Sequence, residues 1–154
     1  MAEKIKLDLV VQEMDSQSDY MSAFLHKKTK KIVFISEEEF TAAEDQEQGE
    51  NMPDWLKSQI KTAEEILYGD SFIPLPSKFD INEYSIMEKF CLSLRDQELS
   101  DIMYKSIKGK GAFRNFKYNV RKYKIEEDWY KFKEKAIGHI AIDWCEANQI
   151  DYEK

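Results

Sequence analysis

The chain has 154 residues, of which 42% are hydrophobic and 13% aromatic, and its net charge is -7. This length suits one domain with a real core, and the apolar content excludes a disordered chain. The acidic balance excludes a protein that coats nucleic acid over its whole surface, although a single basic face remains compatible with it.

The first elements predicted are a short helix and a hairpin. Apolar residues at helical spacing predict an amphipathic helix over residues 5–14. The stretch "YMSAFLHKKTKKIVFIS" then predicts two strands joined by a lysine-rich turn, with Met21, Ala23 and Leu25 on one face. Phe72 and Ile73 are expected to add a short third strand at the edge, where the neighbouring prolines are tolerated.

An acidic segment, residues 36–54, separates the hairpin from the next helix. It reads "SEEEFTAAEDQEQGENMPD", is poor in large apolar groups, and predicts a solvated acidic loop or arm. It is also a candidate surface for a basic partner through Glu37, Glu38, Glu39, Glu44, Asp45, Glu47 and Glu50. Pro53 then suits the first turn of a helix in which Trp55, Ile60, Ala63 and Leu67 recur at roughly helical intervals.

The C-terminal half is predicted to be helical. Asp80 is the expected N-cap of one helix, Asp96 of the next, and Gly109 ends that second helix. Further helices are expected from about residue 112 to 123 and from 126 to about Asn148. The sequence therefore predicts a single α+β domain over residues 1–154: a small N-terminal antiparallel sheet with a helical C-terminal half.

The expected core includes both cysteines and several C-terminal aromatics. Cys91 and Cys145 lie 54 positions apart without a zinc-binding motif, so both are interpreted as reduced core thiols. Phe113, Phe116, Phe132 and Trp144 are predicted to be mostly buried. The chain shows no signal-like or membrane-spanning apolar run, so we expect a cytosolic protein with no membrane partner.

The motif with most chemical content is "GKGAFRNFK", residues 109–117, within a basic segment of residues 105–124. That segment has eight basic residues and no acidic one. Glycines before a helix N-terminus, with lysines beside them, are typical of an anion site. The candidate anion-binding residues are Lys108, Gly109, Lys110, Gly111, Arg114, Lys117 and Arg121. The alternative is a helix junction whose cations are only solvated or are neutralised by the acidic segment.

Other chemistry receives little support. His139, Asp143 and Glu146 share one helical face, but a surface ion pair explains them better than a metal site. We therefore expect no catalytic residues, no metal and no cofactor, and an enzyme ranks last among the function classes. The leading hypothesis is a regulatory or accessory protein that binds nucleic acid or another phosphate-bearing partner. The alternative is a protein–protein interaction module that uses residues 37–54.

"GKGAFRNFK" followed by "DWYKFKEKAIGHIAIDWCEAN" resembles an uncharacterised bacterial protein family, number 0158. The similarity lies in the run Gly-x-Gly-Ala-Phe-x-x-Phe, the Trp-Tyr-x-Phe helix start, the hairpin and "IPLPSKFDINEYSIMEKF". It covers about residues 7–150, and the lysine-rich hairpin turn is its main departure. The resemblance implies a shared fold and no established activity.

Overall fold

The structure is a computed structural model that describes residues 4–45 and 52–154. It divides the chain into two compact units, which are described separately. The first unit contains residues 1–78 and 141–154, and the second contains residues 79–140. Strands lie in the first unit and the second is helical, so the predicted α+β class is confirmed. The prediction of one domain stays a prediction.

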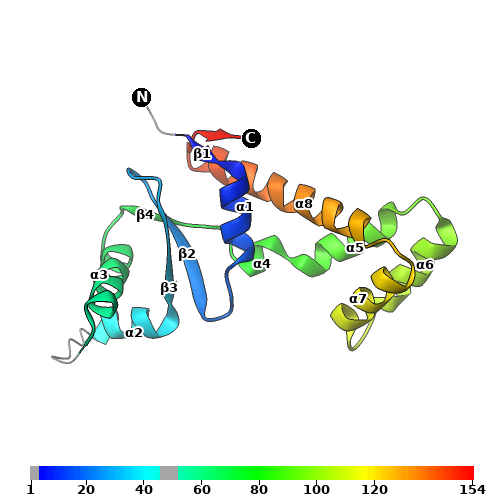
Figure 1. Cartoon of the computed structure of the whole chain (residues 1–154), viewed down its shortest axis with the longest axis horizontal. Helices are drawn as coiled ribbons and strands as arrows, with labels where there is room; N and C mark the ends of the chain where they lie inside the picture. The colour runs from blue at the N-terminus through cyan, green and yellow to red at the C-terminus, as the bar shows by residue number, and fades with distance from the viewer. Residues whose placement is uncertain (1–3, 46–51) are drawn as a thin grey trace. The chain divides into compact units, whose positions relative to one another are not determined.

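The sheet of the first unit has three antiparallel strands in the order β3-β2-β4 (Figure 1). They are β2 (Met21–His26), β3 (Ile32–Ser36) and β4 (Phe72–Pro74). Ala23 pairs with Phe34, and Leu25 pairs with Ile32 on one side and Ile73 on the other. The hairpin and the third strand are both confirmed. Ala23 and Leu25 are buried, as the alternation of residues predicts for one covered face, whereas Met21 at the start of the strand is 39% exposed.

His26 organises the hairpin turn. Its Nδ1 accepts hydrogen bonds from the backbone N–H groups of Lys28 and Thr29, each at 3.2 Å. Its ring packs edge-on against Phe72, with the ring centroids 4.9 Å apart. The turn closes at Lys30, whose φ is 58°. This lysine-rich turn is therefore held by a side-chain acceptor and needs no ligand to explain its shape.

The acidic segment is largely helical where the structure describes it, which corrects the expected loop. Residues Glu37–Asp45 form α2, and Asp54–Tyr68 form α3. The two helices pack on each other, and α2 also contacts β3. A core of Ile35, Ala43, Ile60 and Ala63 joins them to the sheet. Glu47 and Glu50 of the predicted arm lie outside the described residues.

Local chemistry explains why α2 forms despite its charge. The backbone N–H of Ser36 donates to Glu39 Oε1 at 2.8 Å, and the N–H of Glu39 donates to Ser36 Oγ at 3.1 Å. This reciprocal pair is a capping box. The three glutamates in the first turn also complement the positive end of the helix dipole.

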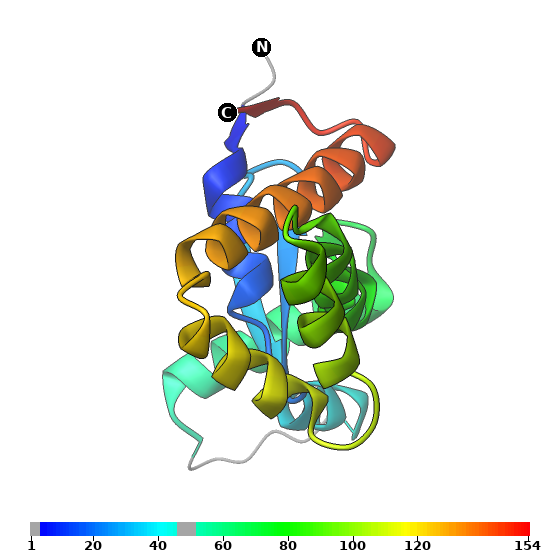
Figure 2. The ribbon, with the colours of Figure 1, turned by 90° about the vertical axis from the view of Figure 1, so that its right-hand side faces the viewer.

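The first unit is completed by the two ends of the described chain. Helix α1 (Leu7–Asp15) follows β1 (Ile5–Lys6), which pairs in parallel with β5 (Tyr152–Glu153). Figures 1 and 2 both show β1 and β5 side by side. The last turns of α8 (Glu126–Ala147) belong here too, and Trp144 Nε1 donates to the carbonyl oxygen of Pro74 at 2.9 Å.

The second unit contains α5 (Glu83–Ser93), α6 (Gln97–Ser106), α7 (Ala112–Lys122) and the first part of α8, preceded by the short α4 (Lys78–Ile81). Its core is an aromatic cluster. The Phe90 ring packs edge-on against Phe116, Trp129 and Phe132, with centroids 5.4–6.1 Å apart. Phe116 and Trp129 are 4.7 Å apart.

Two expectations about these helices are corrected. The N-cap of α5 is Asn82 and not Asp80, because Asp80 lies inside α4 and the Asn82 side chain accepts from Ser85 N–H at 3.2 Å. Phe113 is 49% exposed, so its predicted burial is wrong. Phe116 is buried, and Phe132 and Trp144 are half-buried. The Asp96 cap is confirmed, since its Oδ1 accepts from Leu99 N–H at 3.2 Å.

Both cysteines are free and buried, as expected. Burial raises the pKa of the Cys91 thiol to about 11 and also raises the pKa of Cys145. Each is therefore a neutral thiol near pH 7. Within residues 4–45 and 52–154, no helix is long and apolar enough to cross a membrane.

Candidate functional site

The predicted anion site begins at the connection between α6 and α7. Helix α6 ends at Ser106, and the chain reverses through Gly109 and Gly111, whose φ angles are 97° and 74°. Both angles favour glycine, because a Cβ is strained in the left-handed region. Gly111 is the N-cap of α7 and supplies no side-chain acceptor to its first turn. The glycines thus serve the reversal, as the junction interpretation requires.

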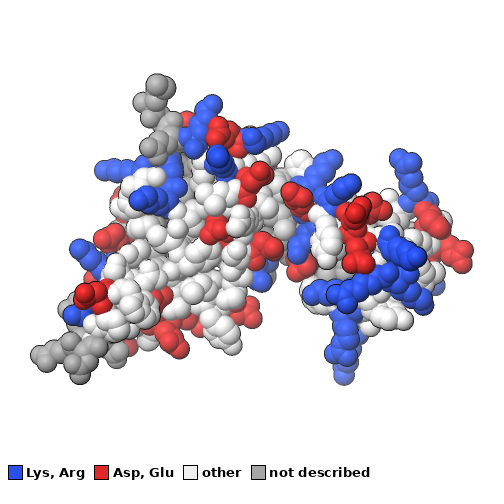
Figure 3. All heavy atoms as spheres, in the orientation of Figure 1, with Lys and Arg blue, Asp and Glu red and all other residues white. Residues whose placement is uncertain are grey.

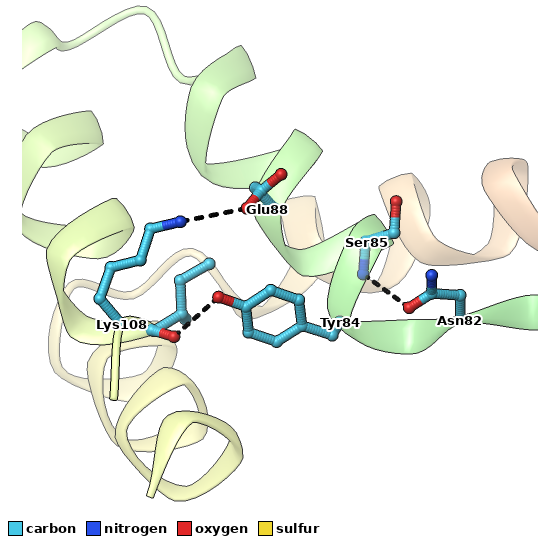
Figure 4. Close-up of polar contacts among 6 residues, drawn as sticks. Asn82, Tyr84, Ser85, Glu88 and Lys108 are labelled. Atoms are coloured by element: carbon cyan, nitrogen blue, oxygen red, sulfur yellow. Dashed lines mark hydrogen bonds and ion pairs between the residues drawn. The ribbon is translucent and has the colours of Figure 1, made fainter. Parts of the chain in front are cut away.

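Lys108, in this connection, is exposed but has an ion-pair partner. Its ammonium forms an ion pair with Glu88 of α5 at 3.2 Å (Figure 4). The same ammonium lies 4.1 Å from the ring centroid of Tyr104. The pKa of Lys108 is raised, first by its side-chain contact with Tyr104 and then by Glu88. Lys108 therefore stays charged but already has an anionic partner.

A second contact fixes the same connection from α5. The hydroxyl of Tyr84 donates to the backbone carbonyl of Ile107 at 3.0 Å, as the close-up shows (Figure 4). Ile107 itself is buried. Together with the Lys108–Glu88 pair, this contact ties the end of α6 to α5. The backbone that precedes α7 is thus anchored, which fixes where the basic helix begins.

Helix α7 separates apolar from cationic side chains, as its spacing predicts. Phe116 and Val120 are buried in the second unit. Arg114, Lys117 and Arg121 are exposed. Lys110, in the connection, is exposed as well. In Figure 3, Lys and Arg side chains gather over α7, with Asp and Glu side chains beside them. The predicted cationic face is therefore present on the surface.

Aromatic side chains lie among these cations, which the sequence did not predict. Phe113 is 49% exposed, Tyr118 64% and Tyr130 62%. The ammonium of Lys122 lies 6.0 Å from the ring centroid of Tyr118 and 5.4 Å from that of Tyr123. Exposed rings beside cations are the combination that stacks bases and holds phosphates in proteins that bind single-stranded nucleic acid.

A small cavity adjoins this face. It measures about 150 Å³ and lies between α7 and the start of α8, where Lys117 and Arg121 approach Tyr130. Glu126 also lines it, so the cavity is not purely cationic. Its volume suits one planar group or one phosphate and is below that of a drug-sized ligand site. In the sequence, Tyr130 could have indicated this cavity, because it is an aromatic residue at a position of the helix where a polar residue is expected.

The remaining candidates for chemistry do not form a metal cluster in the described part of the chain. Over residues 4–45 and 52–154, no group of three or more His, Cys, Asp or Glu side chains is placed to hold a metal ion. His139 and Asp143 are both exposed on α8.

Comparison with known proteins gives one match. The model of a family described as Uncharacterised protein family (UPF0158) matches residues 4–153. The match includes the basic segment, both glycines of the connection and the acidic segment. No curated protein and no solved structure matches the chain.

Proposed function

The chain belongs to that uncharacterised family, and from its own surface we propose that it is a cytosolic accessory protein that binds nucleic acid through the basic segment. The observation that carries the proposal is the α7 surface, where exposed cations and exposed aromatic rings alternate. The cytosolic compartment is supported by two cysteines that remain free thiols.

The candidate anion-binding residues have different roles, which follow from their exposure and their contacts. Lys110, Arg114, Lys117 and Arg121 contact phosphates, because all four are exposed. Lys108 contributes its charge but keeps its place beside Glu88, so a phosphate would compete with that carboxylate for it. Gly109 and Gly111 form the turn that precedes α7. Because the N-cap, Gly111, has no side chain, no cap acceptor occupies the backbone N–H groups of the first turn. Binding is largely independent of sequence, because phosphate contacts position the partner and do not read bases.

The exposed rings favour single strands over duplexes. Phe113, Tyr118 and Tyr130 offer stacking faces, and unpaired bases can lie on such faces at about 1–3 kcal/mol per base. A duplex hides those faces of its bases. The overall charge of -7 opposes any nucleic acid, so we expect modest affinity at physiological salt.

Fluorescence anisotropy at low salt tests this function. Labelled single-stranded DNA, duplex DNA and single-stranded RNA are titrated with the wild type and with Arg114→Glu plus Lys117→Glu. The matched control is Lys27→Glu plus Lys28→Glu in the hairpin turn, which changes the net charge equally at another exposed site. Binding lost only in the α7 variant supports the proposal. No binding by the wild type, or equal loss in both variants, overturns it.

The alternative function, a protein interaction through residues 37–54, has one structural argument in its favour. Glu37, Glu38, Glu44 and Asp45 are exposed on α2, so an ordered acidic surface exists for a basic partner. Glu39 is buried and belongs to the helix cap, so it does not contribute to such a surface.

A further inference from the structure

A cavity in the first unit lies between α2 and α3, beside the start of β2 and the end of β3. Its volume is about 550 Å³, within the range of small-molecule sites. Its walls are mainly apolar and include Met21, Ala42, Leu56 and Ile60. Its polar groups are few, and Glu39 is the most buried of them. An apolar cavity with a small number of placed polar groups is the usual form of a ligand site.

Glu39 is 8% exposed, and only one of its carboxylate oxygens is used. Oε1 accepts from Ser36 N–H at 2.8 Å and from Gln59 Nε2 at 3.4 Å. Within the described chain, no donor is bonded to Oε2, and no lysine or arginine forms an ion pair with Glu39. A carboxylate oxygen that receives no donor from the protein can accept one from water or from a ligand.

The free oxygen has access to open space. Among the described residues, every fully buried side-chain oxygen or nitrogen has a hydrogen-bond partner. Oε2 is therefore not fully enclosed, and the open space that Glu39 lines is this cavity. The Gln59 amide that shares Oε1 is itself fixed, because its Nε2 also donates to the carbonyl oxygen of Phe34 at 2.9 Å. The carboxylate is thus held in place by two neighbours.

Large apolar side chains stand exposed at the edge of the cavity. Trp55 is 66% exposed and Met21 is 39% exposed, and both line it. An indole face attracts an organic cation, and a methionine adapts its shape to an alkyl chain. Glu38, exposed on the same helix as Glu39, adds a second negative charge. These features favour a ligand that is both cationic and apolar.

A metal ion fits this site less well. Calcium and magnesium require many oxygen ligands, whereas the cavity offers two carboxylates and one amide among apolar walls. An anion is excluded by Glu38 and Glu39. A primary ammonium group, which has three donors and one positive charge, suits a carboxylate oxygen such as Glu39 Oε2 and also an indole face such as that of Trp55, and both residues line the cavity.

We propose that this cavity binds an amphipathic alkylamine. The ammonium donates to Glu39 Oε2, and the alkyl chain lies against Ala42 and Leu56 with Trp55 beside the ammonium. The site shares no residue with the nucleic-acid surface, because all its residues belong to the first unit. The result of a test of this site is therefore independent of whether the protein binds nucleic acid.

Isothermal titration of the full-length chain with hexylamine, and with hexanol as its uncharged counterpart, tests the site. The decisive variant is Glu39→Gln, which keeps an acceptor oxygen for the capping box but removes the charge. Glu44→Gln, an exposed change on the same helix, is the matched control. We expect hexylamine to bind the wild type and Glu44→Gln alike, and Glu39→Gln to bind at least tenfold more weakly. Hexanol should bind all three weakly.

Trp55→Ala provides a second variant that does not disturb the core, because this side chain is mostly exposed. It should weaken hexylamine binding severalfold and leave the thermal unfolding midpoint nearly unchanged. The proposal is overturned when the wild type fails to bind hexylamine, when Glu39→Gln binds it as well as the wild type, or when hexanol binds equally. It is also overturned if a lysine-containing peptide binds and hexylamine does not, since the surface would then serve a protein partner.

Discussion

The side-chain amide of Gln17 donates from Nε2 to the backbone carbonyl of Pro76 at 2.7 Å, across 59 positions of the chain. The same nitrogen donates to the carbonyl oxygen of Met14 at 3.2 Å, and Oε1 accepts from the N–H of Ala23 at 3.0 Å. Gln17 is 5% exposed. One buried amide thus joins the end of α1, the central strand β2 and the segment that follows β4.

Gln17→Leu should be strongly destabilising, because it leaves buried backbone groups of Ala23 and Pro76 without partners. At about 1–3 kcal/mol for each unpaired group, we expect a loss of roughly 3 kcal/mol in the free energy of unfolding. Urea denaturation measures it. Gln12→Leu, on the exposed side of α1, is the control and should change stability by no more than ~0.5 kcal/mol. A loss for Gln17→Leu no larger than that of the control contradicts this role of the amide.

The aromatic cluster of the second unit predicts a contrast between two phenylalanines of α7. Phe116 is 1% exposed and packs against Phe90 and Trp129, so Phe116→Ala should cost ~3–5 kcal/mol. Phe113 is 49% exposed, so Phe113→Ala should cost far less and should instead weaken binding of single-stranded DNA. Urea midpoints and anisotropy separate the two effects. Equal destabilisation by both changes would contradict the observed faces of α7.

Substitution by alanine should change the stability of the fold in opposite directions at two glycines. A Cβ at Gly109 meets no atom within 4 Å, so Gly109→Ala is opposed by its φ of 97° alone, at ~1–2 kcal/mol. Gly138 is in α8, and a Cβ added there also meets no atom within 4 Å, so Gly138→Ala should stabilise by ~0.5–1 kcal/mol. Thermal unfolding of the two variants checks the sign of each effect. Stabilisation by Gly109→Ala would show that the connection does not require its left-handed backbone.

The buried thiols should resist modification. Cys91 and Cys145 are both 0% exposed, and burial raises the pKa of each, so neither the thiolate nor a path to it is present at pH 8. Ellman's reagent should react slowly with the native protein and rapidly with two thiols after denaturation in guanidinium. Rapid reaction of one native thiol, assigned with a Cys145→Ala variant, would contradict this burial.

The same shift gives a pH dependence for Cys91. The folded state raises the thiol pKa from 9.0 to about 11, so folding favours the protonated form. Its contribution to stability is therefore full below pH 9 and is lost as the pH rises through about 11. The difference in unfolding free energy between the wild type and Cys91→Ala should shrink over that interval. A constant difference across the same interval would contradict the shift.

Salt dependence distinguishes phosphate contacts from stacking on α7. Four phosphates, engaged by Lys110, Arg114, Lys117 and Arg121, predict a slope of log K against log salt of about -2.8 for single strands. Arg114→Glu plus Lys117→Glu should reduce the magnitude of that slope by at least ~1.4. Tyr130→Ala should weaken binding at every salt concentration and leave the slope unchanged. A slope altered by Tyr130→Ala would assign this residue a different role.

Local sequence rules predicted the elements whose signals are short in range. The hairpin, the edge strand at Phe72, the Asp96 cap and the end of α8 before Asn148 follow from alternation and capping. Helix α2 does not follow so simply, because its charge density favours a loop while the Ser36–Glu39 capping pattern in the same segment favours a helix. Its stability comes from Ala43 packing against residues far along the chain, which no local pattern reveals.

The site was predicted in part for the same reason. Periodicity indicates which residues of α7 share a side, but it does not indicate how far along the helix the covering elements extend. The ring contacts of the aromatic cluster engage Phe116 and leave Phe113, one turn earlier, half exposed. The Lys108–Glu88 pair joins residues 20 positions apart and depends on how α5 and α6 pack. The free oxygen of Glu39 is likewise visible only once α3 has placed Gln59 beside it.

The pairing of β1 with β5 has a consequence for synthesis on the ribosome. Residues 79–140 are contiguous, so all of the second unit emerges before the strand that completes the first unit. Ile5 cannot pair until Tyr152 has been synthesised, and at a synthesis rate of about 5–20 residues per second this takes several seconds or more. During that interval β1 has no partner strand, whereas the sheet β3-β2-β4 needs no residue beyond β4. Early nascent chains should therefore leave β1 open to proteolysis until β5 is made, although the sheet β3-β2-β4 can already be formed.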